Sequence, residues 1–149
     1  DEVSDRRERK ELVQCARPPQ YMTSGSAGAD LSALLSQPIT LEKGESLSIP
    51  TGVFLELPEG FEAQIRPRSG LALRNGITVL NAPGTIDSDY RGELRVLLIN
   101  QGTSAYTIEN GDRIAQLVIA PVIQAHFLQQ DTLTPSARNL DGFGHTGKS

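Results

Sequence analysis

A stretch of twelve residues, 81–92, carries the residue types needed for chemistry on a small polar molecule. It contains two carboxylates, Asp87 and Asp89, the amphipathic aromatic Tyr90 and several turn formers. The runs on either side are rich in leucine and β-branched residues and predict buried strands. A carboxylate on this segment would therefore sit on a rigid β-hairpin, and we take the segment as the candidate active site.

Four further segments place polar groups on turns, where backbone N–H donors are free. The first, 27–31, carries Asp30 after small residues and by itself predicts only a turn. In 66–71, Arg68 and Ser69 precede a short helical run, and both an anion site and a plain helix cap fit them. The third segment, 111–117, is by itself typical of a strand start.

The fourth of these segments is the glycine-rich end of the chain. Residues 142–149 match the spacing G-x-x-x-x-G-K-[ST] of a phosphate-binding loop. That loop requires a preceding strand, a following helix and a separate magnesium carboxylate. Because the match ends at Ser149, the last residue of this sequence, we expect no following helix and no P-loop NTPase core. Successive glycine N–H groups still form an anion nest. Phe143 would either stack on a base or act as a hydrophobic anchor.

Short apolar runs recur at close intervals after residue 38 and predict an all-β sandwich or roll. Turn formers such as Asn75-Gly76 and the 110–112 run separate them. The one helix predicted here is short, Ser69 to Arg74, with Ser69 as its cap and Asn75-Gly76 as its stop. The predicted strands are 45–49, 53–57, 62–66, 77–80, 94–99, 106–108 and 114–119.

The composition restricts the class of protein. A chain of 149 residues suffices for one domain with an ordinary core. The net charge of -4 argues against polymeric nucleic acid as a partner, and no apolar stretch approaches the roughly 20 residues that span a membrane. Cys15 is the only cysteine, so we expect a reducing compartment: the cytoplasm or, in a eukaryote, the nucleus or an organelle.

The first twenty residues and the scattered histidines complete the sequence-based expectations. Residues 1–20 begin with a highly charged run and predict a disordered leader, with a regulatory or partner-binding arm as the alternative. Cys15, His126 and His145 lie far apart in sequence, which predicts no zinc site. Magnesium held mainly by substrate phosphates fits the available carboxylates better.

In their order and spacing, five segments together resemble the five motifs of the homotrimeric dUTP pyrophosphatases, the dUTPases. The resemblance spans about residues 21–147 and implies a small distorted jelly-roll (β-clip) subunit, a homotrimer and active sites shared between chains. It divides the chain into the leader 1–20, a β domain 21–137 and a flexible arm 138–149 that closes the active site. The matching segments are 27–31, 68–72, 84–92, 111–117 and 142–147.

The resemblance also implies a role for each matched residue. Asp87 corresponds to the general base that activates water for in-line attack on the α-phosphorus of dUTP, giving dUMP and pyrophosphate. Tyr90 corresponds to the residue under the deoxyribose that excludes a 2′-hydroxyl, and Asp30 to the carboxylate that helps to hold Mg²⁺ through water. The other matched positions are Asn81, Gly84, Thr85, Ile86 and Arg95 at the uracil, Arg68, Ser69, Gly70 and Gln116 at the phosphates, and Arg138, Phe143, His145 and Thr146 in the closing arm.

The arm departs from the usual family pattern R-G-x-G-G-F-G-S-T-G. Asn139 and Asp141 stand at two of the glycines, and His145 stands at the serine, so a negative charge lies beside the expected phosphate contacts. Two alternatives share the fold. A dCTP deaminase-like enzyme resembles the chain less in the 81–92 segment. A catalytically inactive trimeric nucleotide-binding module would lack Asp87, Tyr90 or Phe143, which are all present.

Overall fold

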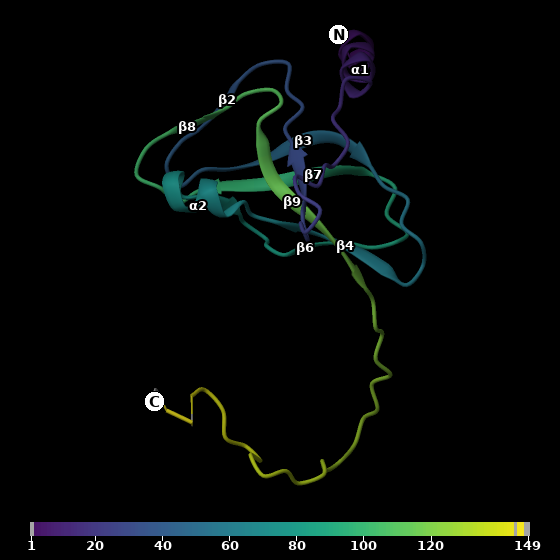
Figure 1. Cartoon of the computed structure of the whole chain (residues 1–149). Coiled ribbons are helices and arrows are strands. Elements are labelled where there is room, and N and C mark those ends of the chain that lie inside the picture. The colour runs from purple at the N-terminus through teal and green to yellow at the C-terminus, as the bar shows by residue number, and fades with distance from the viewer. Residues whose placement is uncertain (1, 145, 148–149) are drawn as a thin grey trace.

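The computed structural model describes residues 2–144 and 146–147. Most of the regular structure is antiparallel strand, as Figure 1 shows, and the expected all-β, jelly-roll class is confirmed. The elements are α1 (Glu2–Val13), β1 (Ala29–Ser32), β2 (Ile39–Leu41), β3 (Ser46–Phe54), β4 (Phe61–Arg66), α2 (Ser69–Asn75), β5 (Ile77–Val79), β6 (Gly84–Ile86), β7 (Glu93–Asn100), β8 (Tyr106–Ile108) and β9 (Arg113–Pro121).

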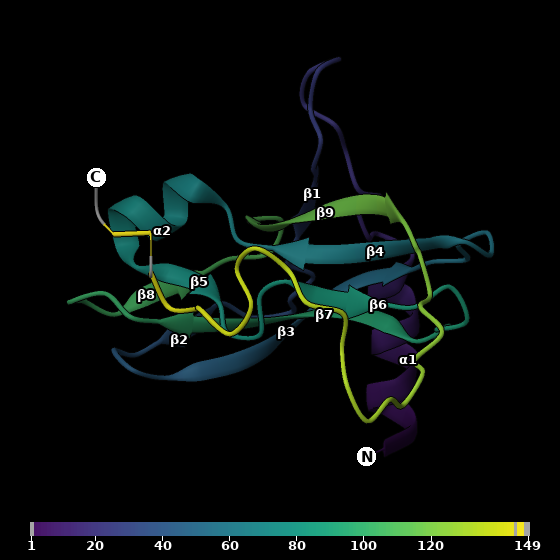
Figure 2. The same ribbon diagram turned by 90° about the horizontal axis from the view of Figure 1, so that it is seen from below.

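The described strands form three sheets around one core. Their orders are β1-β9-β4-β6, β2-β8 and β3-β7-β5. Figure 2 shows β9 and β4 on one side and β3 and β7 on the other, and β6 pairs with β4. Buried side chains from all three sheets meet between them, among them Leu31, Leu41, Ile65, Val96 and Ile108. The core therefore fixes the sheets, and through them the loops, relative to one another.

The strand β7 shows how the sequence produces this core. Every second residue is buried, from Leu94 to Asn100, as the two-residue period of a strand requires. Asn100 is polar and fully buried, and its side chain is satisfied. Its Nδ2 donates to the main-chain oxygens of Leu41 and Ser104 at 2.9 and 2.8 Å, and its Oδ1 accepts from the Gly102 N–H at 2.9 Å. These bonds fasten the turn after β7.

The segment 81–92 differs from the simple hairpin loop that the sequence predicts. It contains β6, which pairs with β4, whereas the flanking strands β5 and β7 pair with each other in another sheet. The chain therefore crosses from one sheet to the other and returns. Asp87 follows directly after β6, so both sheets support the position of this carboxylate.

The leader also differs from the expected disordered segment, because residues 2–13 form α1. Straight-chain side chains such as Glu, Arg and Lys have good helix propensity. Arg9 forms an ion pair with Glu93 at the start of β7, and its Nη1 donates to the main-chain oxygen of Leu34 at 3.4 Å. Glu93 Oε1 also accepts from the Gly52 N–H at 2.8 Å. These contacts hold α1 against the β domain.

The short helix α2 forms where the sequence predicts it, but with a different start. Its N-cap is Arg68 in an extended conformation, and no side chain caps it, so the predicted cap role of Ser69 is wrong. Its end agrees with the prediction. Gly76 has the left-handed angles φ 68 and ψ 18, and its N–H binds the main-chain oxygens of Ala72 and Leu71.

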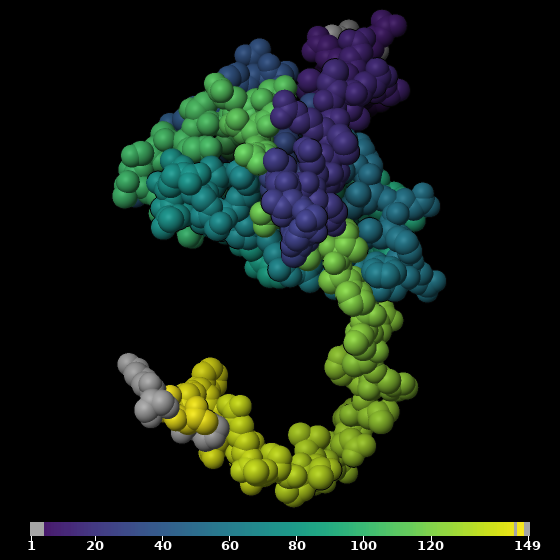
Figure 3. All heavy atoms as spheres, in the orientation of Figure 1, coloured from purple at the N-terminus to yellow at the C-terminus, as the bar shows by residue number. Residues whose placement is uncertain are grey.

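Beyond β9 the chain leaves the β domain as an extended arm. Figure 3 shows this arm curving away from the rest of the molecule. Among its exposed apolar side chains are Ile123, Phe127, Leu133 and Phe143. No helix among the described residues is both long and apolar enough to cross a membrane.

Candidate functional site

Asp87 lies at a cavity of about 820 Å³. Its side chain is exposed, and residues around the start of β4 and the beginning of the C-terminal arm form the other walls. Four carboxylates line this cavity, and Arg91 is its one cationic side chain within the described part of the chain. A polyphosphate that enters it therefore needs positive charge from elsewhere. The lining residues are Leu57, Glu59, Gly60, Phe61, Glu62, Asp87, Ser88, Asp89, Arg91, Val122 and Gln124.

Tyr90 is held by contacts within its own turn. Its hydroxyl donates to the main-chain oxygen of Glu93 at 3.0 Å. A Cβ built on Gly92 would lie 2.6 Å from Tyr90 Cζ, so the hydroxyl end of the ring lies close over Gly92. The ring remains 44% exposed, which leaves a face available to a ligand.

The other predicted residues of this region lie at β6, just before it, or on β7. A Cβ built on Gly84 would lie 3.4 Å from Asn81 Nδ2, so these two residues lie together at the start of β6. The Arg95 side chain is turned toward β3: its Nε donates to Ser48 Oγ at 2.9 Å and its Nη2 to the Ser48 main-chain oxygen at 3.0 Å. Thr85 and Ile86 complete β6.

A second group of predicted residues meets at the start of α2. Asp30 on β1 is buried, and its Oδ2 accepts a hydrogen bond from Arg113 Nη1 at 3.1 Å. Its Oδ1 lies 3.8 Å from Arg68 Nε, and Arg68 Nη1 donates to the Arg113 main-chain oxygen at 3.2 Å. Ser69 and Gly70 follow as the first residues of α2.

Gln116 belongs to the same group because of the sheet register. It faces Asp30 on one neighbouring strand and Arg66 on the other. A Cβ on Gly28 would lie 3.0 Å from the Gln116 side chain, so the small residues before Asp30 make room for this amide. The predicted phosphate-binding residues Arg68, Ser69, Gly70 and Gln116 are thus gathered around the strands β1, β9 and β4.

Arg113 was not among the predicted site residues, although it pairs with Asp30. Only a general rule pointed to such a residue, namely that a buried carboxylate is almost always paired with a cation. The rule does not say which cation. Asp30 follows a run of small residues, and a burial argument would have required a cationic partner. Nothing in the spacing of the sequence points to a residue 83 positions away.

The two groups lie at opposite ends of β4. Ile86, just before Asp87, faces Ala63, whereas Arg66 ends the strand and leads to Arg68. Three residue steps of a strand span about 10 Å, and two further residues separate Arg66 from Arg68. Among the described residues, no hydrogen bond or ion pair joins the two groups. One chain alone therefore does not bring Asp87 to the predicted phosphate-binding residues Arg68, Ser69, Gly70 and Gln116, which we call the phosphate-type residues.

The distal part of the arm, which begins at Arg138 and carries the predicted residues, lies apart from both groups in this chain, as Figure 1 shows. Phe143 and Thr146 are exposed, and Arg138 Nε donates to the main-chain oxygen of Asp141 within the arm. His145, the fourth predicted residue of the arm, lies outside the described residues.

The carboxylates of the described residues do not form a complete magnesium site by themselves. Across residues 2–144 and 146–147, no three His, Cys, Asp or Glu side chains gather as a metal-binding group. The two oxygens of Asp30 face Arg113 and Arg68. Direct ligation by Asp30 would have to displace these arginines. The residues therefore fit an ion that is held mainly by substrate phosphates and reaches Asp30 through water.

The pKa of Tyr106, on β8, is affected by charges on and around α2 and by Asp112. Burial raises the pKa of Tyr106, and the negative charge of Asp112 raises it further. The positive charges of Arg68 and Arg74 act in the opposite direction. The net effect is upward, so Tyr106 stays neutral at physiological pH.

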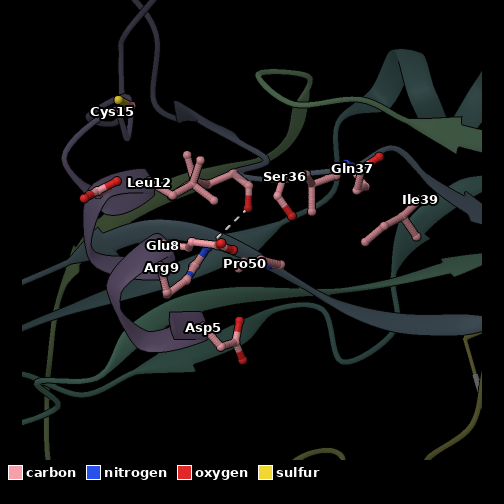
Figure 4. Close-up of a pocket in the computed structure, with 12 residues that line it drawn as sticks. Asp5, Glu8, Arg9, Leu12, Cys15, Ser36, Gln37, Ile39 and Pro50 are labelled. Atoms are coloured by element: carbon pink, nitrogen blue, oxygen red, sulfur yellow. Dashed lines mark hydrogen bonds between the residues drawn. The ribbon is translucent and has the colours of Figure 1, made fainter. Parts of the chain in front are cut away.

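A second cavity, of about 590 Å³, lies between α1 and the β domain. Figure 4 shows Arg9 and Glu8 of α1 facing Ser36 and Pro50 across it. Cys15 also lines it and is exposed. None of the predicted site residues lines this cavity, so it is separate from the two groups described above.

The comparisons with known proteins agree with the resemblance of the five segments. The dUTPase family model matches residues 15–147. The deoxyuridine 5′-triphosphate nucleotidohydrolase of Chlamydia pneumoniae is 60% identical over 140 residues, which cover 93% of this chain and 97% of that protein. The enzyme of the same name from Treponema denticola is 61% identical over 136 residues, covering 91% and 94%.

Solved structures give the same result for the fold. A mutant dUTPase of Staphylococcus bacteriophage 80alpha, solved with dUpNHpp, is similar with a TM-score of 0.81 and 27% identity, covering 89% of this chain and 93% of that chain. A mutant dUTPase of phage phi11 of S. aureus, whose structure concerns the coordination of a structural Mg(II) ion, has a TM-score of 0.71 and 25% identity, covering 78% and 91%. By family model and by sequence identity, this chain belongs to the dUTPase family.

Proposed function

We propose that this chain is a dUTP diphosphatase that converts dUTP to dUMP and pyrophosphate. Membership of the dUTPase family supports the substrate, and relatives that share about 60% of their residues carry the name of that activity. The single observation that supports the chemistry best is the position of Asp87, exposed at a cavity directly after a strand. The activity would limit uracil in DNA and supply dUMP for dTTP synthesis.

In the proposed reaction, Asp87 acts as the general base. Its carboxylate accepts a proton from a water molecule, and the oxygen of that water attacks the α-phosphorus in line with the departing pyrophosphate. The bond between the α-phosphorus and its bridging oxygen breaks. Arg68, Ser69, Gly70 and Gln116 bind the phosphates and position them for this attack.

The uracil and sugar would be recognised by the segment that carries Asp87. Main-chain groups of β6 and the neighbouring Asn81 would read the edge of the base. Tyr90 would pack under the deoxyribose, where a 2′-hydroxyl would collide with its ring. Phe143 would cover the base when the arm closes, with Arg138, His145 and Thr146 at the terminal phosphate.

The proposed cofactor is Mg²⁺, which when bound neutralises the triphosphate and lowers the energy of the departing pyrophosphate. Asp30 would hold it through water, since both carboxylate oxygens already face arginines. The structural Mg(II) ion of the phage phi11 relative supports a metal in the family.

We further propose that three copies form a homotrimer with shared active sites. Asp87 and the phosphate-type residues lie at opposite ends of β4, so a second copy is needed to complete a site. Two exposed apolar side chains of the Asp87 cavity, Phe61 and Val122, would be buried by such an assembly.

A substrate panel tests the activity. The purified chain is incubated with Mg²⁺ and dUTP, UTP, dCTP or dTTP, while pyrophosphate and ammonia are both measured. We expect pyrophosphate from dUTP and no ammonia from any substrate. Ammonia from dCTP would indicate a deaminase, and binding of dUTP without any product would indicate an inactive binding module.

The role of Asp87 is tested by Asp87→Asn, which keeps the shape of the side chain and removes its basicity. Because general-base catalysis is worth about 10²–10⁴-fold, kcat should fall by at least about 10²-fold while dUTP binding is retained. Glu59→Gln is the control, since Glu59 lines the same cavity and its change removes the same charge. Near-normal turnover of Asp87→Asn would remove Asp87 from the proposed role.

A further inference from the structure

Two arginines lie at the ends of α2, Arg68 at the N-cap and Arg74 in the last turn, and their contacts differ. Arg68 donates to the Arg113 main-chain oxygen at 3.2 Å and has Asp30 Oδ1 at 3.8 Å from its Nε. Part of its charge and of its donor capacity is therefore satisfied within the chain. Arg74 is exposed and has neither a hydrogen bond nor an ion pair with any residue that the structure describes.

Arg74 nevertheless lies against the first turn of α2. Side chains four residues apart share a helix face and lean toward the N-terminus, which places Arg74 over Gly70. A Cβ built on Gly70 would lie 2.9 Å from Arg74 Nη2 and 3.2 Å from Nη1. The guanidinium therefore packs over the backbone of a predicted phosphate-binding residue, and a side chain at position 70 would displace it.

The electrostatic surroundings agree with this geometry. The charges of both Arg68 and Arg74 act on the hydroxyl of Tyr106, where they oppose the effects of burial and of Asp112. Both guanidinium groups thus lie close enough to Tyr106 to lower its pKa, although burial and Asp112 raise it overall. Of the two, Arg74 is the one whose N–H donors are not engaged by the described residues.

We propose that Arg74 is a further phosphate-binding residue of the active site, while Arg68 is oriented by Asp30 and Arg113. The planar fork of a guanidinium matches two oxygens of a phosphate chain. This assignment rests on the proposed dUTP-hydrolysing function. The competing role is purely structural, because a positive charge in the last turn of a helix also stabilises the helix.

Three variants of the full chain separate these roles: R74Q, R74K and, as the matched control, R66Q. Arg66 is exposed, and its Nη2 donates to Gln64 Oε1 at 2.7 Å, so R66Q removes the same charge from the neighbouring strand. Binding of dUpNHpp and of dUMP is measured by calorimetry with Mg²⁺. In the same buffer, kcat and KM for dUTP and the melting temperature are recorded.

We expect R74Q to weaken dUpNHpp binding about tenfold to hundredfold, the usual size of a charge-assisted hydrogen bond. The affinity for dUMP, which has a single phosphate, should fall less. R74K should restore part of the loss because it keeps the charge without the fork. R66Q should stay within about twofold of the wild type, because the Arg66 guanidinium is bound to the Gln64 side chain and does not lie over Gly70.

Several results would overturn the assignment. Wild-type affinity in R74Q would do so, as would an equal loss in R66Q, or a lower melting temperature with unchanged affinity. The turnover of dUTP by the wild type tests the proposed function independently of the role of Arg74. A wild type that releases no pyrophosphate from dUTP would reject the proposed function, whereas the difference in dUpNHpp binding between R74Q and R66Q would still decide the role of Arg74.

Discussion

The Tyr90 ring is held by contacts at its hydroxyl end. Its hydroxyl binds the main-chain oxygen of Glu93, and the ring lies over Gly92, where any side chain would collide with it. Glu93 is itself held by Arg9 and by the Gly52 N–H. If Tyr90 packs under the sugar as proposed, a ring held in this way would resist displacement by a larger sugar.

Replacing Tyr90 tests this discrimination. Tyr90→Ala removes the ring, and we expect kcat/KM for UTP relative to dUTP to rise by about tenfold or more, the scale of steric selectivity in a pocket. Tyr90→Phe is the matched control, since it keeps the ring and loses only the bond to Glu93. Steady-state kinetics with both nucleotides measure the ratio. An unchanged ratio in Tyr90→Ala would show that the ring does not select the sugar.

At the scale of elements, the position of α2 depends on the glycine that follows its last residue. Gly76 adopts left-handed angles, and a Cβ there would lie 2.5 Å from the Cα of Gly102. Gly102 is in turn bound through its N–H to the buried Asn100 side chain. The end of α2 thus packs closely against a turn of the β domain that hydrogen bonds of Asn100 hold in place. This contact positions Ser69 and Gly70 at the other end of the helix.

Gly76→Ala should therefore cost more than backbone strain alone. The left-handed conformation costs a non-glycine residue about 1–2 kcal/mol, and the collision with Gly102 adds to it. Gly44→Ala is the matched control: Gly44 also has positive φ, but nothing lies within 4 Å of its built Cβ. Denaturant unfolding should show a larger loss in free energy for Gly76→Ala. Equal losses would mean that the turn yields to the extra methyl group.

The elements also show what the sequence can and cannot predict. The β class, the end of α2 at Gly76 and the exposure of Asp87 on a supported turn followed from local patterns of apolar and turn-forming residues. The pairing of β6 with β4 did not, because a three-residue strand has no distinctive periodicity. The helix α1 was missed because its docking depends on Arg9 meeting Glu93, which lies 84 residues away.

The same distinction applies to the site. The predicted phosphate-type residues come together because β1 and β4 both pair with β9, and this register is set by the whole core. Spacing along the chain contains no information about the contact of Arg113 with Asp30. The resemblance of the five segments to the dUTPase motifs identified the predicted site residues. It did not identify Arg113, whose contact with Asp30 exists only in the folded chain. The individual roles of these residues in catalysis remain predictions.

At the scale of the whole molecule, three parts of the proposed site are separate in one chain. The Asp87 cavity and the phosphate-type residues lie toward different ends of β4, and the arm extends away from the β domain (Figure 3). Assembly with other copies would bring such parts together, and an arm that orders over a substrate would contribute positioning.

Deleting residues 138–149 tests the contribution of the arm. The β core does not include these residues, so the truncated chain should fold and keep the oligomeric mass of the full chain. Its turnover of dUTP should fall by about 10²-fold, since misplacement of reacting groups has costs of that order. Sedimentation and steady-state kinetics provide the two readouts, with deletion of 148–149 as the control. Full activity of the truncated chain would exclude a closing role for the arm.

The exposed arm also makes the protein vulnerable to proteases. Exposed loops are preferred targets of proteolytic enzymes, and Arg138 presents a trypsin-type cleavage point in an exposed turn five residues before Phe143. A single cut there would leave the β domain intact and remove the segment proposed to cover the base. Limited digestion would then silence the enzyme without unfolding it, so a preparation can look homogeneous by size and still be inactive.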